Sequence, residues 1–152
     1  MRQVRVLADD HQIYVLDPEG PGPAKGTSDD LRDVMLEVGE QGFTIGTLSG
    51  LGVEVELDVR DDAPQVDLGA WDHAVRGGLA SSSGVLVLEN PGAPDDERLE
   101  VPAGPLTVLV LVGGLYEPDA QDEGKDRYRV HVWPERSDGV EVLKQVDWSV
   151  VE

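Results

Sequence analysis

Histidine is the residue type here best suited to acid–base catalysis or metal binding, because it titrates near neutral pH and is a common metal ligand. The chain has three histidines, His11, His73 and His131, and none of them forms an HxH or HExxH pair. A metal site would have to gather Asp, Glu and His from distant segments. His131 falls on the polar face of its expected strand, so we expect it to be exposed. The sequence therefore predicts no metal site.

Nucleophilic catalysis has few candidates. The serines at 81–83 precede Gly84 and look like a turn, and no G-x-S-x-G elbow is present. Asp72 and His73 are neighbours on an expected strand, so their side chains point to opposite faces and cannot form the usual Asp–His bond. There is no cysteine to supply a thiol, a disulfide or a thiolate ligand. We predict that the chain is not an enzyme and binds no cofactor.

Acidic residues are concentrated in the segment 117–126. They are Glu117, Asp119, Asp122, Glu123 and Asp126. Their spacing does not match a calcium-binding EF-hand loop, in which acids alternate ahead of a glycine. The segment is therefore either a solvated acidic loop, which is the prediction, or a weak and irregular Ca²⁺ site.

In the segments that position these residues, apolar and polar side chains alternate with a period of two residues. In residues 52–60, Val53, Val55 and Leu57 alternate with acidic residues, which is typical of a half-buried strand. Residues 11–16, 127–133 and 139–146 show similar alternation, and Gly/Pro turns separate the runs. The pattern predicts an all-β fold, an antiparallel β-sandwich of about seven to nine strands. We expect one domain over residues 1–152.

One segment departs from this period. Leu31, Val34, Met35 and Val38 recur at helical spacing after Ser28, a suitable N-cap. A glycine at 39 or 42 would end the helix. We therefore expect one short helix inserted between strands.

The charge is strongly negative and evenly spread. The chain has twelve Lys and Arg residues and thirty-one Asp and Glu residues, which gives a formal net charge of -19. Residues 1–76 hold 6 basic and 16 acidic side chains, and residues 77–152 hold 6 and 15. Such a surface repels nucleic acid and anionic membranes and suits a basic partner, cations or solubility, including solubility in a salty cytoplasm. We predict no direct binding of nucleic acid and no membrane insertion. The cysteine-free chain, with no apolar signal stretch, is expected in the cytoplasm.

The order of several short motifs resembles the competence protein J family, small acidic inhibitors of a DNA-entry nuclease. The matching segments are 41–43, 71–75, 83–87, 101–108, 113–115 and 126–134. Departures are Pro105 after Gly104 and the pair Gly77-Gly78. The resemblance implies a non-catalytic, inhibitor-type or immunity-type protein whose partner is a basic protein such as a nuclease.

Two regions are the predicted partner-binding residues. Glu54, Glu56 and Asp58 are expected about 6.6 Å apart along one strand face, a rigid line of negative charge. The second region is the acidic segment, with Glu117, Asp119, Asp122, Glu123 and Asp126. The strand carboxylates could equally be a solvated face. The alternative function is a cation- or small-molecule-binding β-sandwich, and the sequence leaves the oligomeric state open.

Overall fold

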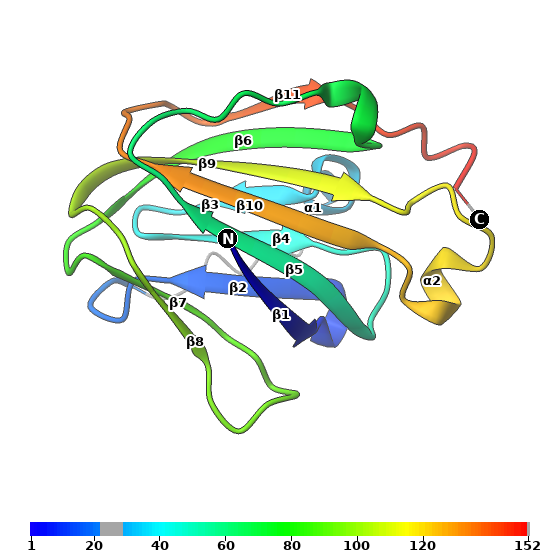
Figure 1. Ribbon diagram of the computed structural model, residues 1–152, viewed down its shortest axis with the longest axis horizontal. Coiled ribbons are helices and arrows are strands. Elements are labelled where there is room, and N and C mark those ends of the chain that lie inside the picture. The colour runs from blue at the N-terminus through cyan, green and yellow to red at the C-terminus, as the bar shows by residue number, and fades with distance from the viewer. Residues whose placement is uncertain (22–28, 152) are drawn as a thin grey trace.

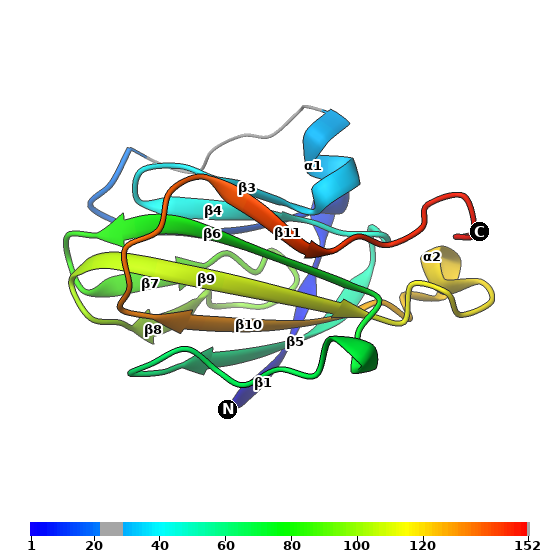
Figure 2. The same ribbon diagram turned by 90° about the horizontal axis from the view of Figure 1, so that it is seen from above.

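The computed structural model, described here for residues 1–21 and 29–151, consists of two β-sheets packed face to face (Figures 1 and 2). The six-stranded sheet has the order β1 (Arg2–Leu7), β5 (Gly52–Val59), β10 (Arg127–Trp133), β9 (Gly104–Gly113), β6 (His73–Ser81), β11 (Val140–Lys144). The five-stranded sheet has the order β3 (Leu36–Val38), β4 (Gly42–Gly46), β2 (Gln12–Leu16), β7 (Val85–Leu88), β8 (Glu97–Glu100). The predicted all-β sandwich is confirmed. It has eleven strands in the described residues, more than the seven to nine expected.

The alternating sequence pattern accounts for the core between the sheets. Val53, Val55 and Leu57 of β5 are at most 3% exposed and face inward. Phe43 and Tyr128 are the largest side chains that they meet in the same cluster. Burial of this apolar area from both sheets is the main stabilising contribution.

One strand pairing is parallel. β10 lies between β9, with which it is antiparallel, and β5, with which it runs parallel. All other pairings in the described sheets are antiparallel. Parallel neighbours need a long connection, and here β6 to β9 lie between β5 and β10 in sequence. This pairing sets which side chains meet on the outer face.

The inserted helix is shorter than predicted. α1 spans Asp29–Val34, whereas residues assigned to its end form β3, which pairs with β4 through Leu36 and Ile45. Met35 separates helix and strand with a φ of 65°, in the left-handed region. Tertiary pairing with β4 thus overrides the local helical spacing that Val38 suggested. The expected cap, Ser28, lies outside the described residues.

Further helical turns are short. They are α2 (Ala120–Glu123) and two 3₁₀ turns, Asp9–His11 and Leu68–Ala70. No helix in the described part of the chain is long and apolar enough to cross a membrane.

Buried polar side chains tie the two sheets together at their margins. Asn90, after β7, accepts a hydrogen bond from Leu7 N and donates one to Arg5 O, so it covers the open edge of β1. Asp17, after β2, is fully buried and accepts bonds from Ser81 Oγ at 2.6 Å and from Ser83 N and Oγ at 3.0 and 2.8 Å. Burial alone would raise the pKa of Asp17, but these bonds, with one from Glu19 N, lower it to about 2. The serine turn at 81–83 is therefore held by a structural carboxylate.

Candidate functional site

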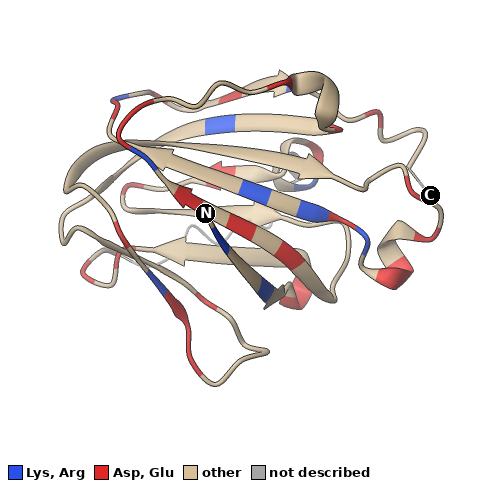
Figure 3. Cartoon of the chain, viewed as in Figure 1, with Lys and Arg blue, Asp and Glu red and all other residues tan. Residues whose placement is uncertain are grey.

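The predicted acidic face of β5 exists, but it is matched by basic residues. Because β10 runs parallel to β5, Arg127, Arg129 and His131 lie opposite Glu54, Glu56 and Asp58 respectively. Figure 3 shows the acidic blocks along β5 beside the basic blocks along β10. We call these six residues the charge ladder.

Contacts within the charge ladder strengthen along the strands. Glu54 is exposed, and within the described residues its one ion pair is with Arg5 of β1, at 3.9 Å. Arg129 Nη2 lies 3.2 Å from both carboxylate oxygens of Glu56. Asp58 accepts a bond of 2.8 Å from His131 Nδ1 and lies 3.4 Å from Arg60. The side chains of Glu56 and Asp58 are only 21% and 18% exposed, so two of the three predicted carboxylates are engaged within the protein.

His131 is buried, contrary to the prediction that it is exposed. Burial lowers the pKa of His131, and Asp58 only partly opposes this effect. Burial would raise the pKa of Asp58, but the His131 bond and the nearby Arg60 lower it. We conclude that at neutral pH a neutral His131 donates its Nδ1 proton to an ionised Asp58. The expectation failed because the connection from β5 to β6 covers this part of the sheet.

That connection, residues 60–72, passes over the outer face of the six-stranded sheet (Figure 2). Trp71 of this connection packs in a second apolar cluster with four residues of the sheet, Ala74, Leu109, Leu111 and Trp133. The guanidinium carbons of Arg127 and Arg129 lie 4.9 and 5.0 Å from the Trp71 ring centroid, within cation–π range. The outer face is thus a packed layer that rigidifies the charge ladder.

The acidic segment 117–126, the acidic loop, contains α2 and is largely exposed (Figure 1). Its members Glu117, Asp119 and Asp122 have no ion pair within the described residues, whereas Glu123 pairs with Lys125 at 2.9 Å. Asp126 differs, because it is 1% exposed. Its Oδ2 accepts bonds from Ser49 N at 3.1 Å and Tyr128 Oη at 2.5 Å. Asp126 therefore fixes the base of the loop and does not present its charge to solvent.

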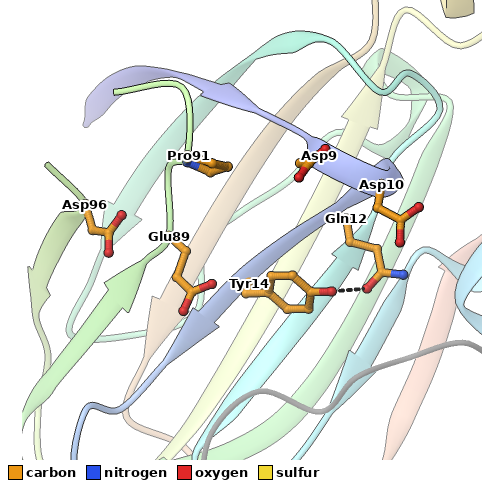
Figure 4. Close-up of a pocket in the computed structure, with 7 residues that line it drawn as sticks. All are labelled: Asp9, Asp10, Gln12, Tyr14, Glu89, Pro91 and Asp96. Carbon is orange, nitrogen blue, oxygen red and sulfur yellow. Dashed lines mark hydrogen bonds between the residues drawn. The ribbon is translucent and has the colours of Figure 1, made fainter. Parts of the chain in front are cut away.

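A third acidic region was not predicted. A hollow of about 520 Å³ opens between the Asp9–His11 turn, β2 and the connection from β7 to β8. Its lining, the acidic hollow, consists of Asp9, Asp10, Gln12, Tyr14, Glu89, Pro91 and Asp96. Figure 4 shows these side chains, which come from two stretches of the chain, residues 9–14 and residues 89–96. No Lys or Arg is among them.

The environment of the acidic hollow is strongly negative. Burial, followed by the carboxylates of Asp10, Glu89 and Asp9, raises the pKa of Tyr14. Tyr14 Oη donates to Gln12 Oε1 at 2.7 Å, and Asp96 Oδ1 accepts from Asn90 N at 2.9 Å. Asp10 has a φ of 57°, a conformation that Asp tolerates better than most residues. In the sequence these acids read only as separate turns, and no local signal links them.

The residues considered for catalysis serve structural bonds. Asp72 Oδ2 accepts a bond from Leu115 N at 2.9 Å, and both ring nitrogens of His73 bond backbone groups. Ser81 and Ser83 bond Asp17, not a histidine. Across residues 1–21 and 29–151, no group of three or more His, Asp or Glu is arranged to hold a metal ion.

These features define an acidic, two-sheet β-sandwich with the charge ladder on the outer face of the six-stranded sheet and the acidic hollow between the Asp9–His11 turn, β2 and the connection from β7 to β8. No family model and no curated protein matches the sequence. Two solved structures match the fold. ComJ of Bacillus subtilis, an inhibitor of the DNA-degrading activity of NucA, has a TM-score of 0.70 and 10% identity over 89% of this chain and 96% of its own. A protein described as crocagin biosynthetic gene J has a TM-score of 0.57 and 18% identity over the same shares. The chain therefore has a ComJ-like fold.

Proposed function

We propose that this protein is a non-catalytic binding module that inhibits a basic protein, most specifically a nuclease, by covering its nucleic-acid-binding surface. The observation that carries the proposal is the ComJ-like fold over 89% of the chain, since ComJ inhibits the DNA-degrading activity of NucA. A nuclease must attract phosphate, so its cleft is basic. A rigid acidic surface can occupy such a cleft in place of the nucleic acid.

The charge distribution indicates which surfaces would serve. Carboxylates that are already paired, such as Glu56 and Asp58, add little to the field outside the protein. The carboxylates of the acidic hollow have no Lys or Arg among the other lining residues. In the acidic loop, Glu117, Asp119 and Asp122 form no ion pair within the described residues, although the charge of Lys125 acts on Glu117 and Asp119. We propose the acidic hollow and the acidic loop as the contact surface, with Glu54 as a peripheral charge. The charge ladder would hold the sheet rigid, so that little order is lost on binding.

A second candidate is favoured by the acidic hollow, which could take a cation or a small cationic molecule in place of a protein. Ligand that binds the native state raises the melting temperature by mass action. Thermal melts with and without millimolar Ca²⁺ distinguish the candidates: a large rise supports cation binding, and an unchanged melt supports a protein partner. The cysteine-free chain suits the reducing cytoplasm, the proposed compartment for either function.

The decisive experiment is an inhibition assay. Purified protein is titrated into DNA degradation by NucA and by any nuclease encoded beside this gene. We expect inhibition at equimolar protein that weakens as salt rises, because screening reduces the attraction between acidic and basic surfaces. The degradation assay is repeated with the protein alone, which should degrade no DNA. Absence of binding to every basic nuclease tested would overturn the inhibitor proposal.

A further inference from the structure

The C-terminal segment, residues 145–151, is attached to the sandwich by a small number of specific bonds. Gln145 Nε2 and Trp148 Nε1 both donate to Asp33 O near the end of α1, at 2.8 and 3.0 Å. Val146 is 1% exposed and belongs to the main core. Asp147 N donates to Tyr116 Oη at 2.9 Å, so the segment also contacts the base of the acidic loop.

His73 joins this segment to α1. Its Nε2 lies 2.7 Å from Val34 O, and its Nδ1 lies 3.1 Å from Val146 N. A carbonyl can only accept, so Nε2 carries the proton, and a backbone N–H can only donate, so Nδ1 must be unprotonated. The two bonds therefore require neutral imidazole in one tautomer. His73 is fully buried, and no other use of its ring is apparent from the described residues.

Protonation of Nδ1 would replace the hydrogen bond by a repulsive contact, because the N–H of Nδ1 and the N–H of Val146 would then point at each other across 3.1 Å. We propose that His73 is a pH-sensitive latch, and that protonation of its ring releases residues 145–151 from α1 and from Tyr116. Release would unpair Val146 N and withdraw the Asp147 bond from Tyr116 Oη. The acidic loop would then lose one of its attachments to the sandwich. The switch would couple acidification to the mobility of a charged surface.

The charged side chains near His73 are not among the causes of its pKa shift. The elements packed around His73 are its own strand β6, the neighbouring strands β9, β11 and β3, α1 and the C-terminal segment. The acidic or basic side chains that the structure describes on these elements are those of Arg76, Arg32, Asp33, Glu37, Glu141, Lys144 and Asp147, with Asp72 just before β6; β9 has none. The pKa of His73 is lowered by burial, opposed only by the bond to Val34, and no charged side chain is among the causes. The latch is therefore closed at neutral pH and opens on the acid side of the ordinary histidine range.

Nuclear magnetic resonance of the full chain tests the latch. The imidazole nitrogens of His73, the amide of Val146 and the indole N–H of Trp148 are followed from neutral to acid pH. Hydrogen exchange of the Val146 amide, corrected for its intrinsic pH dependence, should speed up with the same midpoint as His73, by up to about tenfold per pH unit. Amides of the central strand β9 should keep their protection through the same range.

Two variants separate His73 from other titrating groups. His73→Gln can still donate to Val34 O and accept from Val146 N, so the pH dependence of Val146 exchange should vanish. His131→Gln removes the other buried histidine and should leave the pH dependence of Val146 exchange unchanged. The proposal fails if His73 titrates without any change at Val146. It also fails if His73 titrates only together with loss of β9 protection, which would mean global unfolding. The wild-type and His131→Gln data decide between these outcomes even if His73→Gln does not fold.

Discussion

On the outer face of β5, Glu56 and Asp58 are bonded to Arg129 and His131 of β10, whereas the carboxylates of the acidic hollow face one another with no Lys or Arg among its lining residues. The two regions use the same side-chain chemistry in different surroundings. In the charge ladder, removal of one charge leaves its half-buried partner without a counter-ion. In the acidic hollow, removal of one charge relieves repulsion. The first arrangement stabilises the native state, and the second creates an external field that a basic partner can use.

The largest expected effect is on stability and belongs to the charge ladder. The triple change Glu54→Gln, Glu56→Gln, Asp58→Asn should lower the free energy of unfolding by about 2 kcal/mol, because Arg129 loses its counter-ion and His131 its charged acceptor. Exposed Glu54 contributes little to this loss. Urea unfolding measures the effect. Unchanged stability would show that these contacts are merely solvated ion pairs.

The next effect is on association and belongs to the acidic hollow. The triple change Asp9→Asn, Asp10→Asn, Glu89→Gln should slow association with a basic nuclease about tenfold at low salt and flatten its salt dependence. Its stability should be unchanged or slightly raised. Asp96 is left intact because it accepts the bond from Asn90 N.

A matched control for this triple removes three exposed charges elsewhere. The change Glu100→Gln, Glu135→Gln, Asp138→Asn has the same effect on net charge, and none of these residues forms an ion pair within the described chain. Stopped-flow or surface-binding kinetics compare the two. Equal slowing by both triples would mean that only net charge matters and that the hollow is not a specific contact surface.

A smaller effect is the response to pH. The pKa of His131 is lowered in the folded state, so the unfolded chain binds more protons once the pH falls below the ordinary histidine value. The stability that neutral His131 contributes is therefore complete above about pH 6.5 and is lost as the pH falls from there toward its folded pKa. Between about pH 7.5 and pH 5.5, this residue should lower the free energy of unfolding by at most about 1.4 kcal/mol, the limit reached if His131 stays neutral in the folded state. His73 adds a loss of the same sign, so the comparison is between wild type and His131→Gln by urea unfolding. An equal pH dependence in both proteins would contradict the assignment.

The smallest effect is the response of stability to salt. Raising salt to about 0.5 M should stabilise the wild type by a few tenths of a kcal/mol, because repulsion within a chain of net charge -19 is screened. The acidic-hollow triple should gain less, since part of that repulsion is already removed. Thermal melts at two salt concentrations measure the difference. A larger gain in the triple than in the wild type would contradict the repulsive character of the hollow.

The sequence alone determined the two faces of the strands that alternate strictly. Strict alternation in β5 placed Val53, Val55 and Leu57 in the core and the acids outside, since side chains of a strand alternate between faces whatever its neighbours are. It also determined the total charge and the absence of thiol chemistry. The order of the motifs from Trp71 to Pro134 was sufficient to indicate the ComJ-like fold, which the likeness to ComJ supports.

The tertiary structure decided which acidic side chains are paired or buried and which carry their charge at the surface. The parallel pairing of β10 with β5 gave Glu56 and Asp58 their partners, although both strands showed the same period in the sequence. Asp126 is buried, and Asp9, Asp10 and Glu89 share a hollow, because turns far apart in the chain meet at one margin of the sandwich. Leu36 and Val38 join a strand because β4 is available to pair with them. Local sequence determines which face of a strand a side chain lies on. The distant segment packed against that face determines whether its charge is paired, buried or exposed to solvent.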